Sequence, residues 1–322
     1  MTDQTPPAFD SAAPAKPWMR LGVKPSLWWL APLAGVAAVS ALVVGMALAH
    51  VIDDDMDFGP GTVTVPQSRA VAIASRLVFR EVDQHKWTAN DPFFTPSGWL
   101  DNMPNFQQGM VAALARYVRV MADMSDRGQG PDMELERAAG LLTYPGTIWK
   151  FDPSTSWLPT ASSEKQYRNA ARNLAEYNNR QIAGTGDAER NAEALQTLVA
   201  ALGQDLAAAS AIIDKHLAEG HSALFDPKAD DVFYVTKGKV YAYALLLREI
   251  GWDYAHVLTA RDQAAQWRQM VESLKAAAAL EPAVVLNGAP DGNFVPSHLT
   301  AQGFYLLRAR AQLTDIAEHL AR

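Results

Sequence analysis

A run of 26 residues without Asp, Glu, Lys or Arg, at positions 27–52, constrains this chain of 322 residues more than any other feature. A helix needs about 20 apolar residues to cross the hydrocarbon core of a bilayer, so the run is long enough to span a membrane. Basic residues precede it and acidic residues follow it, namely Lys16, Arg20 and Lys24 and then Asp53, Asp54, Asp55 and Asp57. Because basic flanks favour the cytoplasmic side, we predict a transmembrane helix at 27–52 that contacts the lipid bilayer of a bacterial inner membrane, with a cytoplasmic N-terminus and a periplasmic bulk.

The alternative for this run is a cleaved signal peptide. The sequence Ala-Leu-Ala at 47–49 resembles the small residues that precede a signal cleavage site. The apolar run is longer than the roughly 7–15 residues of a signal h-region, which favours an uncleaved anchor. Whether the segment is cleaved stays open from the sequence.

The composition excludes several classes of site. The chain has no Cys, which excludes thiol catalysis, disulfides, Cys-based zinc sites and iron–sulfur clusters. Its formal net charge is −7, and an acidic body without a basic stripe argues against binding of nucleic acid. We expect neither a cofactor nor a metal. The acidic residues at 53–57 have the spacing of a calcium loop, but Phe58 and Thr64 replace its glycine and glutamate, so we predict a solvated flank.

The remainder of the chain has the apolar periodicity of helices. We predict a disordered tail at 1–26, a linker at 53–65 and one helical domain at 66–322, so that the fold is all-α: an elongated helical bundle with one N-terminal transmembrane helix. Helices are expected at 68–82, 106–124, 132–142, 163–183, 188–219, 231–258, 260–279 and 299–321. The only extended piece that the sequence indicates is a short one at 283–288.

The stretch at 97–105, "SGWLDNMPN", joins polar and aromatic residues in a segment that precedes a helix. Pro104 cannot continue a preceding helix, so we interpret Asn105 as the N-cap of the next one, with Gln108 completing a capping box. The alternative is a polar binding site in this loop. A similar capping box is expected at 163–166, where Ser162 and Lys165 also match a weak Ser-x-x-Lys nucleophile pattern without its partner motifs.

The helix at 231–258 is rich in aromatic residues, and Asp230 is a good N-cap for it. Buried tyrosine hydroxyls need polar partners, so this helix could line a groove together with the loops at 88–104 and 281–298. Its charged residues are expected on a solvated face, namely Asp231, Lys237, Lys239 and Arg248.

Three segments, "WLDNMPN" at 99–105, "DDVFYVTKGKVYAYALLLREI" at 230–250 and "VVLNG" at 284–288, together resemble bacterial domain-of-unknown-function family 2333. The resemblance implies a single-pass inner-membrane protein of Gram-negative bacteria. It implies no reaction and no catalytic residue, because the family has none assigned.

Our first functional hypothesis is a structural or protein-interaction module of the cell envelope, with an envelope protein or a second copy of the chain as its partner. The alternatives are a module that binds lipid or glycan, and an envelope hydrolase; the missing catalytic motifs lean against an enzyme, and the catalytic residues stay unknown. The binding candidates come from the three resembling segments and their flanks: Trp99, Asp101, Asn102, Asp230, Asp231, Tyr234, Asn287 and His298.

Overall fold

The computed structural model describes the residues 30–49, 51–92, 94–126, 130–151, 158–184, 190–219, 226–282, 284–288 and 295–322. The predicted tail at 1–26 and the first three residues of the predicted transmembrane helix lie outside the described residues. By its contacts the chain divides into two units, Met1–Val44 and Gly45–Arg322, which are described separately.

The N-terminal unit contains most of α1 (Leu30–Ala49). This helix is apolar on all sides, and none of its residues between Leu30 and Leu48 is buried. It therefore has the length, composition and exposure of a membrane span or of a signal sequence. Helix α6 (Ala192–Ala218) is also long and apolar enough to cross a membrane, but it buries one leucine-rich face inside the second unit, as a core helix does.

The described residues contain ten α-helices and no strand, and all of the helices except α1 lie wholly in the second unit. The all-α prediction is confirmed. The other helices are α2 (Arg69–Phe79), α3 (Asn102–Ser125), α4 (Met133–Leu142), α5 (Ser163–Ile182), α7 (Pro227–Asp253), α8 (Ala255–Ala260), α9 (Ala264–Ala278) and α10 (His298–Leu320). A π-helical turn at Arg80–Gln84 extends α2, and a short 3-10 turn lies at Pro96–Trp99. The extended piece expected near 283–288 forms one antiparallel bridge, between Asn287 and Ser297.

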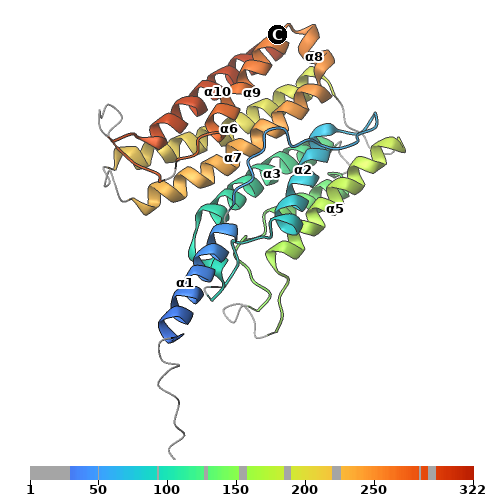
Figure 1. Ribbon diagram of the computed structural model, residues 1–322. Helices are drawn as coiled ribbons and strands as arrows, with labels where there is room; N and C mark the ends of the chain where they lie inside the picture. Colours follow the sequence, from blue (N-terminus) through green and yellow to red (C-terminus); the bar gives the residue numbers. More distant parts are fainter. Residues whose placement is uncertain are drawn as a thin grey trace, which may run out of the picture. The chain divides into compact units, whose positions relative to one another are not determined.

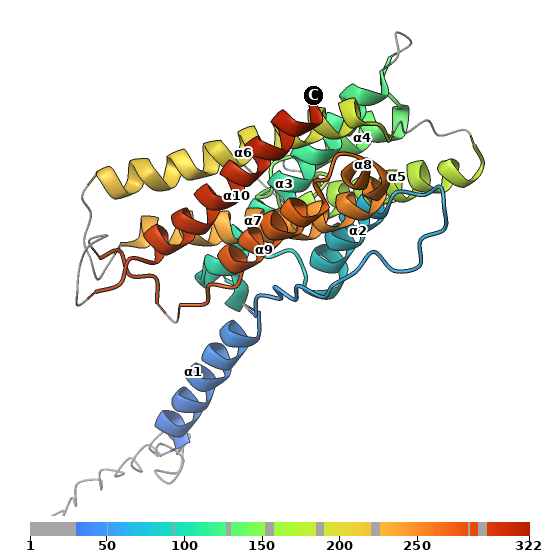
Figure 2. The same cartoon turned by 90° about the horizontal axis from the view of Figure 1, so that it is seen from above.

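Two groups of helices pack together in this unit (Figures 1 and 2). Helices α2, α3, α4 and α5 form one group, and α6, α7, α9 and α10 form the other. Their main contact is the crossing of α3 and α7, where two glycines face the opposite backbone. A Cβ atom on Gly109 would lie 2.0 Å from the carbonyl oxygen of Val235, and one on Gly238 would lie 1.9 Å from that of Phe106. The crossing therefore requires glycine at both positions.

The chain between α1 and α2 contains a segment that we call the N-terminal strap, residues 51–59 (Figure 2). The strap packs on α2 and α7, so the solvated flank that we predicted at 53–57 is wrong for Asp53 and Asp54, whereas Asp55 and Asp57 are exposed as predicted. Asp54 pairs with Lys237 at 2.7 Å, and Asp53 pairs with Arg80 at 3.5 Å. Buried cations need paired charges, and these two carboxylates supply them.

Backbone carbonyls of the strap hold it to the same helices. Arg80 donates to the carbonyl oxygen of Asp53 at 2.9 Å, and Tyr241 donates to that of Asp55 at 2.9 Å. Arg248 donates to the carbonyl oxygens of Met56 and Phe58, both at 2.5 Å. These bonds, three of them from charged guanidinium groups, fix a segment that has no regular secondary structure of its own.

The solvated face that we predicted on the aromatic helix is also wrong for its basic residues. Lys237 is 2% exposed, and its ammonium group also donates to the carbonyl oxygen of Leu280. Lys239 pairs with Asp205 at 2.8 Å. Helix α7 is covered by α3, α9 and the N-terminal strap on different sides, so most of its surface faces protein rather than water.

Two predicted helix starts and one predicted capping box are corrected. Helix α3 begins at Asn102 rather than after Asn105, because proline is tolerated in a first turn and Pro104 lies there. Helix α7 begins at Pro227, and its N-cap is Asp226, which accepts from the backbone N–H of Ala229 at 3.1 Å. The predicted capping box at 163–166 is absent, because the hydroxyl of Ser163 donates to the carbonyl of Pro145 instead.

Candidate functional site

Five of the sequence-predicted site residues meet where the first turns of α3 and α7 lie together. Asn105 donates to the carboxylate of Asp231 at 2.7 Å. With its amide oriented to suit the surrounding acceptors, Asn102 donates to Asp230 at 2.6 Å and to Asp101 at 3.3 Å. Tyr234 lies one turn beyond Asp230 on α7, and burial together with the charge of Asp230 raises its pKa. The structure therefore brings Asp101, Asn102, Asp230, Asp231 and Tyr234 into one acidic cluster.

The electrostatics of this acidic cluster favour protonation of one carboxyl group. Burial, together with the charges of Asp101 and Asp231, raises the pKa of Asp230 to about 6. Burial also raises the pKa of Asp231, although the hydrogen bond from Asn105 opposes this effect. The amides of the cluster bond to its carboxylates, so the arrangement joins α3 to α7. Within the described ranges, no group of three or more His, Asp and Glu side chains is placed to hold a metal ion.

Replacing Asp230 by Asn is expected to stabilise the protein at pH 8 by about 1 kcal/mol, a value reduced for solvent screening. The carboxyl is harder to ionise in the folded protein than in the unfolded chain, so the folded state loses stability as the pH rises from about 3.8 through about 6. The gain should therefore largely disappear at pH 4. Urea denaturation at the two pH values checks this, with the exposed Asp214→Asn as control; an equal gain at both would contradict the electrostatic reason.

Asn287 and His298 belong to a second cluster. Its centre is Asp226, the N-cap of α7, which lies one turn before Asp230. Asn287 donates to Asp226 at 3.0 Å, and His216 bonds to the same carboxylate oxygen at 2.7 Å. Burial tends to raise the pKa of Asp226, but these hydrogen bonds hold it below its ordinary value. His298 accepts from the backbone N–H of Leu286 at 2.9 Å. This cluster fixes the segment 284–288 against the starts of α7 and α10.

The sequence-predicted residues are thus divided between two clusters, and Trp99 stands apart from both. Its side chain is 63% exposed, in the 3-10 turn before α3. His221, which the sequence placed near His216, lies outside the described residues.

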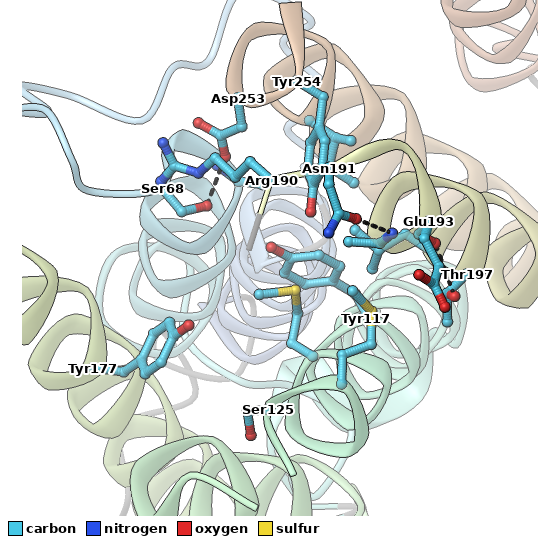
Figure 3. A pocket seen from close by; sticks show the side chains of 16 residues that line it. Ser68, Tyr117, Ser125, Tyr177, Arg190, Asn191, Glu193, Thr197, Asp253 and Tyr254 are labelled. Atoms are coloured by element: carbon cyan, nitrogen blue, oxygen red, sulfur yellow. Dashed lines mark hydrogen bonds between the residues drawn. The ribbon is translucent and has the colours of Figure 1, made fainter. Parts of the chain in front are cut away.

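A cavity of about 340 Å³ lies at the other end of α7, between α2, α3, α5, α6 and α7 (Figure 3). None of the eight predicted binding residues lines it. Its wall carries hydroxyl, amide, carboxylate and guanidinium groups, which belong to Ser68, Tyr117, Ser125, Tyr177, Arg190, Asn191, Glu193, Thr197, Asp253 and Tyr254. Only Tyr254 was indicated by the sequence, as one of the aromatic residues of the helix at 231–258.

Helix termini position the polar groups of this cavity. Asp253, at the last residue of α7, accepts from the hydroxyl of Ser68 at 2.6 Å and from the backbone N–H groups of Arg69 and Ala70. The carboxylate thus satisfies free N–H groups at the start of α2. Asn191 caps α6 by accepting from the backbone N–H of Ala194 at 2.8 Å. Both side chains are fixed by the secondary structure that they terminate.

Tyrosine hydroxyls reach into the cavity from different helices. Figure 3 shows the hydroxyls of Tyr117 and Tyr254 and the amide of Asn191 directed toward the same space. Burial raises the pKa of Tyr117 and of Tyr254 well above the ordinary tyrosine value, so both hydroxyls stay protonated. Neutral donors beside aromatic rings suit a hydroxylated ligand. The lining residues do not include a histidine or a lysine that could act as a base.

Comparison with known proteins gives a family and no described activity. A search of curated proteins found no match, and a search of solved structures found none either. The model of one family, described as uncharacterized protein conserved in bacteria, matches residues 40–196 and 193–322. These two matches cover the chain from the second half of α1 to its end. The chain therefore belongs to the bacterial family of domain of unknown function 2333 (DUF2333).

Proposed function

We propose that this protein is a membrane-anchored binding module of the bacterial cell envelope, which takes a small hydroxylated ligand of the glycan type. The tyrosine-lined cavity between α2, α3, α5, α6 and α7 carries this proposal. Its volume of about 340 Å³ lies in the range of small-molecule sites, roughly 300–1,000 Å³. The apolar, exposed helix α1 and the charges on its two flanks support an anchor in the inner membrane with the helical body in the periplasm.

The chemistry of the cavity favours a neutral ligand over a charged one. The Asp253 carboxylate on its wall already accepts hydrogen bonds from Ser68 and the start of α2, which leaves Glu193 and Arg190 with opposite charges, so neither sign of charge dominates. Protonated hydroxyls of Tyr117 and Tyr254 can donate to sugar oxygens, and their rings can pack on the apolar faces of a sugar. A hydrolase receives less support, because the polar residues from the three motifs are divided between two clusters.

Binding of a neutral sugar tests the proposal. The full-length protein in lipid nanodiscs should bind N-acetylglucosamine or its β-1,4-linked disaccharide, measured by calorimetry. Tyr117→Phe and Tyr254→Phe should each weaken binding roughly five- to tenfold, because each loses one hydrogen bond while the ring remains. The matched control is Tyr243→Phe, which removes a buried hydroxyl that donates to Asp205 at 2.7 Å, away from the cavity.

Two results would count against this proposal. The first is the absence of any heat of binding with both sugars. The second is equal weakening by all three tyrosine variants, which would indicate a general loss of stability. A stable homodimer or partner complex that is lost on replacing Phe304 and Leu307, two exposed apolar residues one turn apart on α10, would favour the protein-interaction module instead.

A further inference from the structure

A second cavity, of about 550 Å³, lies between the C-terminal end of α7 and the helices α8 and α9, and its lining is mainly apolar. We call it the tryptophan groove. Trp252 and Trp267 line it with Leu258 and Val271. Trp252 is 65% exposed although it is a large apolar side chain. A cavity of this size with an exposed aromatic residue at its edge is typical of a ligand site rather than of a packing defect.

The floor of the tryptophan groove is already formed. The indole N–H of Trp267 donates to the carbonyl oxygen of Leu247 at 2.9 Å, and the side chain is buried. A Cβ atom on Gly251 would lie 2.5 Å from that indole nitrogen, so the ring rests directly on the α7 backbone. Because these side chains are already ordered, binding of a ligand would cost less of their conformational entropy.

Basic residues outnumber acidic ones at the tryptophan groove. Arg248, Arg268 and Lys275 line it with one carboxylate, that of Glu272, which pairs with Lys275 at 2.9 Å. Arg248 pairs with Glu249 at 2.8 Å, a carboxylate that it shares with Arg69. Arg268 is exposed, and no carboxylate among the described residues pairs with it. In an acidic chain, an apolar groove with an unpaired cation is complementary to a ligand that has an apolar body and one negative charge.

We propose that the tryptophan groove binds a single-chain anionic amphiphile, such as a fatty acid. The acyl chain lies along Trp252, Trp267 and Val271, and the carboxylate pairs with Arg268. The apolar lining stabilises the chain by removing it from water, and the open side of the groove leaves the charged head hydrated. This site is separate from the tyrosine-lined cavity, and it does not depend on the sugar ligand proposed for that cavity.

Photolabelling tests the proposed occupant. Full-length protein in phosphatidylcholine nanodiscs is irradiated with palmitic acid that carries a diazirine in its chain, and labelled peptides are mapped by mass spectrometry. We expect labels at Trp252, Leu258 or Val271 that excess unlabelled palmitate removes. Arg268→Glu should reduce this labelling at least tenfold, whereas Arg172→Glu, a control at an exposed arginine of α5, should leave it unchanged.

Three outcomes would overturn the proposal. Labelling restricted to α1 would indicate lipid-embedded probe only. Labelling of the groove that survives Arg268→Glu would show that the charge of Arg268 does not contribute to binding. Equal labelling by the neutral alcohol analogue of the probe would show the same for the carboxylate of the ligand. Circular dichroism of both arginine variants verifies that they keep the wild-type fold, which their exposed positions lead us to expect.

Discussion

Replacing Gly238 by Ala is expected to destabilise this protein by about 3 kcal/mol, one of the two largest effects that the structure predicts. The new Cβ atom would lie 1.9 Å from the carbonyl oxygen of Phe106, well inside van der Waals contact. A backbone oxygen cannot rotate away as a side chain can, so α3 and α7 would have to separate. Separation would also weaken the buried contacts that the two groups of helices share.

Chemical denaturation followed by circular dichroism measures this loss. The control is Gly203→Ala in α6, where an added Cβ atom meets nothing within 4 Å. Alanine forms helix more readily than glycine by about 1 kcal/mol, so this control should be unchanged or more stable. Similar stabilities for the two variants would show that α3 and α7 can move apart at little cost.

Replacing Glu81 by Gln is the second large change, with an expected loss of about 3–5 kcal/mol. Glu81 is fully buried in the π-helical turn, and its carboxylate accepts from Arg80 at 2.9 Å and from Gln107 at 3.1 Å. The neutral amide would leave the guanidinium of Arg80, 2% exposed, with only the more distant Asp53 as a counter-charge.

The same substitution should change the pH dependence of stability. The hydrogen bond to Glu81 raises the pKa of His85 above its ordinary value, so this histidine contributes stability below about pH 6.5 that is lost as the pH rises through the raised pKa. Denaturation at pH 5.5 and pH 8.5 should show a smaller difference for the variant than for the wild type. Glu136→Gln breaks a half-exposed pair with Arg119 and should cost less than about 1 kcal/mol. An equally small cost for Glu81→Gln would contradict the buried-charge argument.

The apolar periodicity was sufficient to predict the long helices, but not the break between α7 and α8 at Tyr254 or all of the helix ends. The leucines of α6 mark one buried face, and both ends of this helix lie within four residues of the predicted range. The predicted starts of α3 and α7 were too late. Judged by residue type alone, Asn105 and Asp230 are N-caps of the same quality as the observed N-cap residues, Asp101 and Asp226. Which cap is used depends on packing: Asn105 and Asp230 instead bond across the α3–α7 contact.

The burial of charge could not be predicted from a single helix. Lys237 and Arg248 look solvated in the sequence because the segment that covers them, the N-terminal strap, lies more than 170 positions earlier in the chain. Gly238, between two lysines of α7, is explained by the helix crossing, which involves the distant Phe106. Both features depend on contacts between distant segments.

The candidate site also depends on contacts between distant segments, which the sequence alone does not reveal. The motif residues of α3 and α7 do meet, but they form a titratable junction rather than a cavity. The tyrosine-lined cavity takes residues from five helices, and Ser68 and Asp253, which bond there, are 185 positions apart. Nothing in the local pattern around Tyr117 or Asn191 distinguishes them from ordinary core and capping residues.

The N-terminal strap has a mechanical consequence. A load that enters the helical body at residue 51 meets the strap first, where Arg80, Tyr241 and Arg248 hold successive carbonyls. These donors belong to α7 and to the π-helical turn that extends α2, so part of the load passes to both before it reaches the start of α2 at Arg69. The strap would therefore distribute a load from the N-terminal side over α2 and α7 before either helix began to unwind.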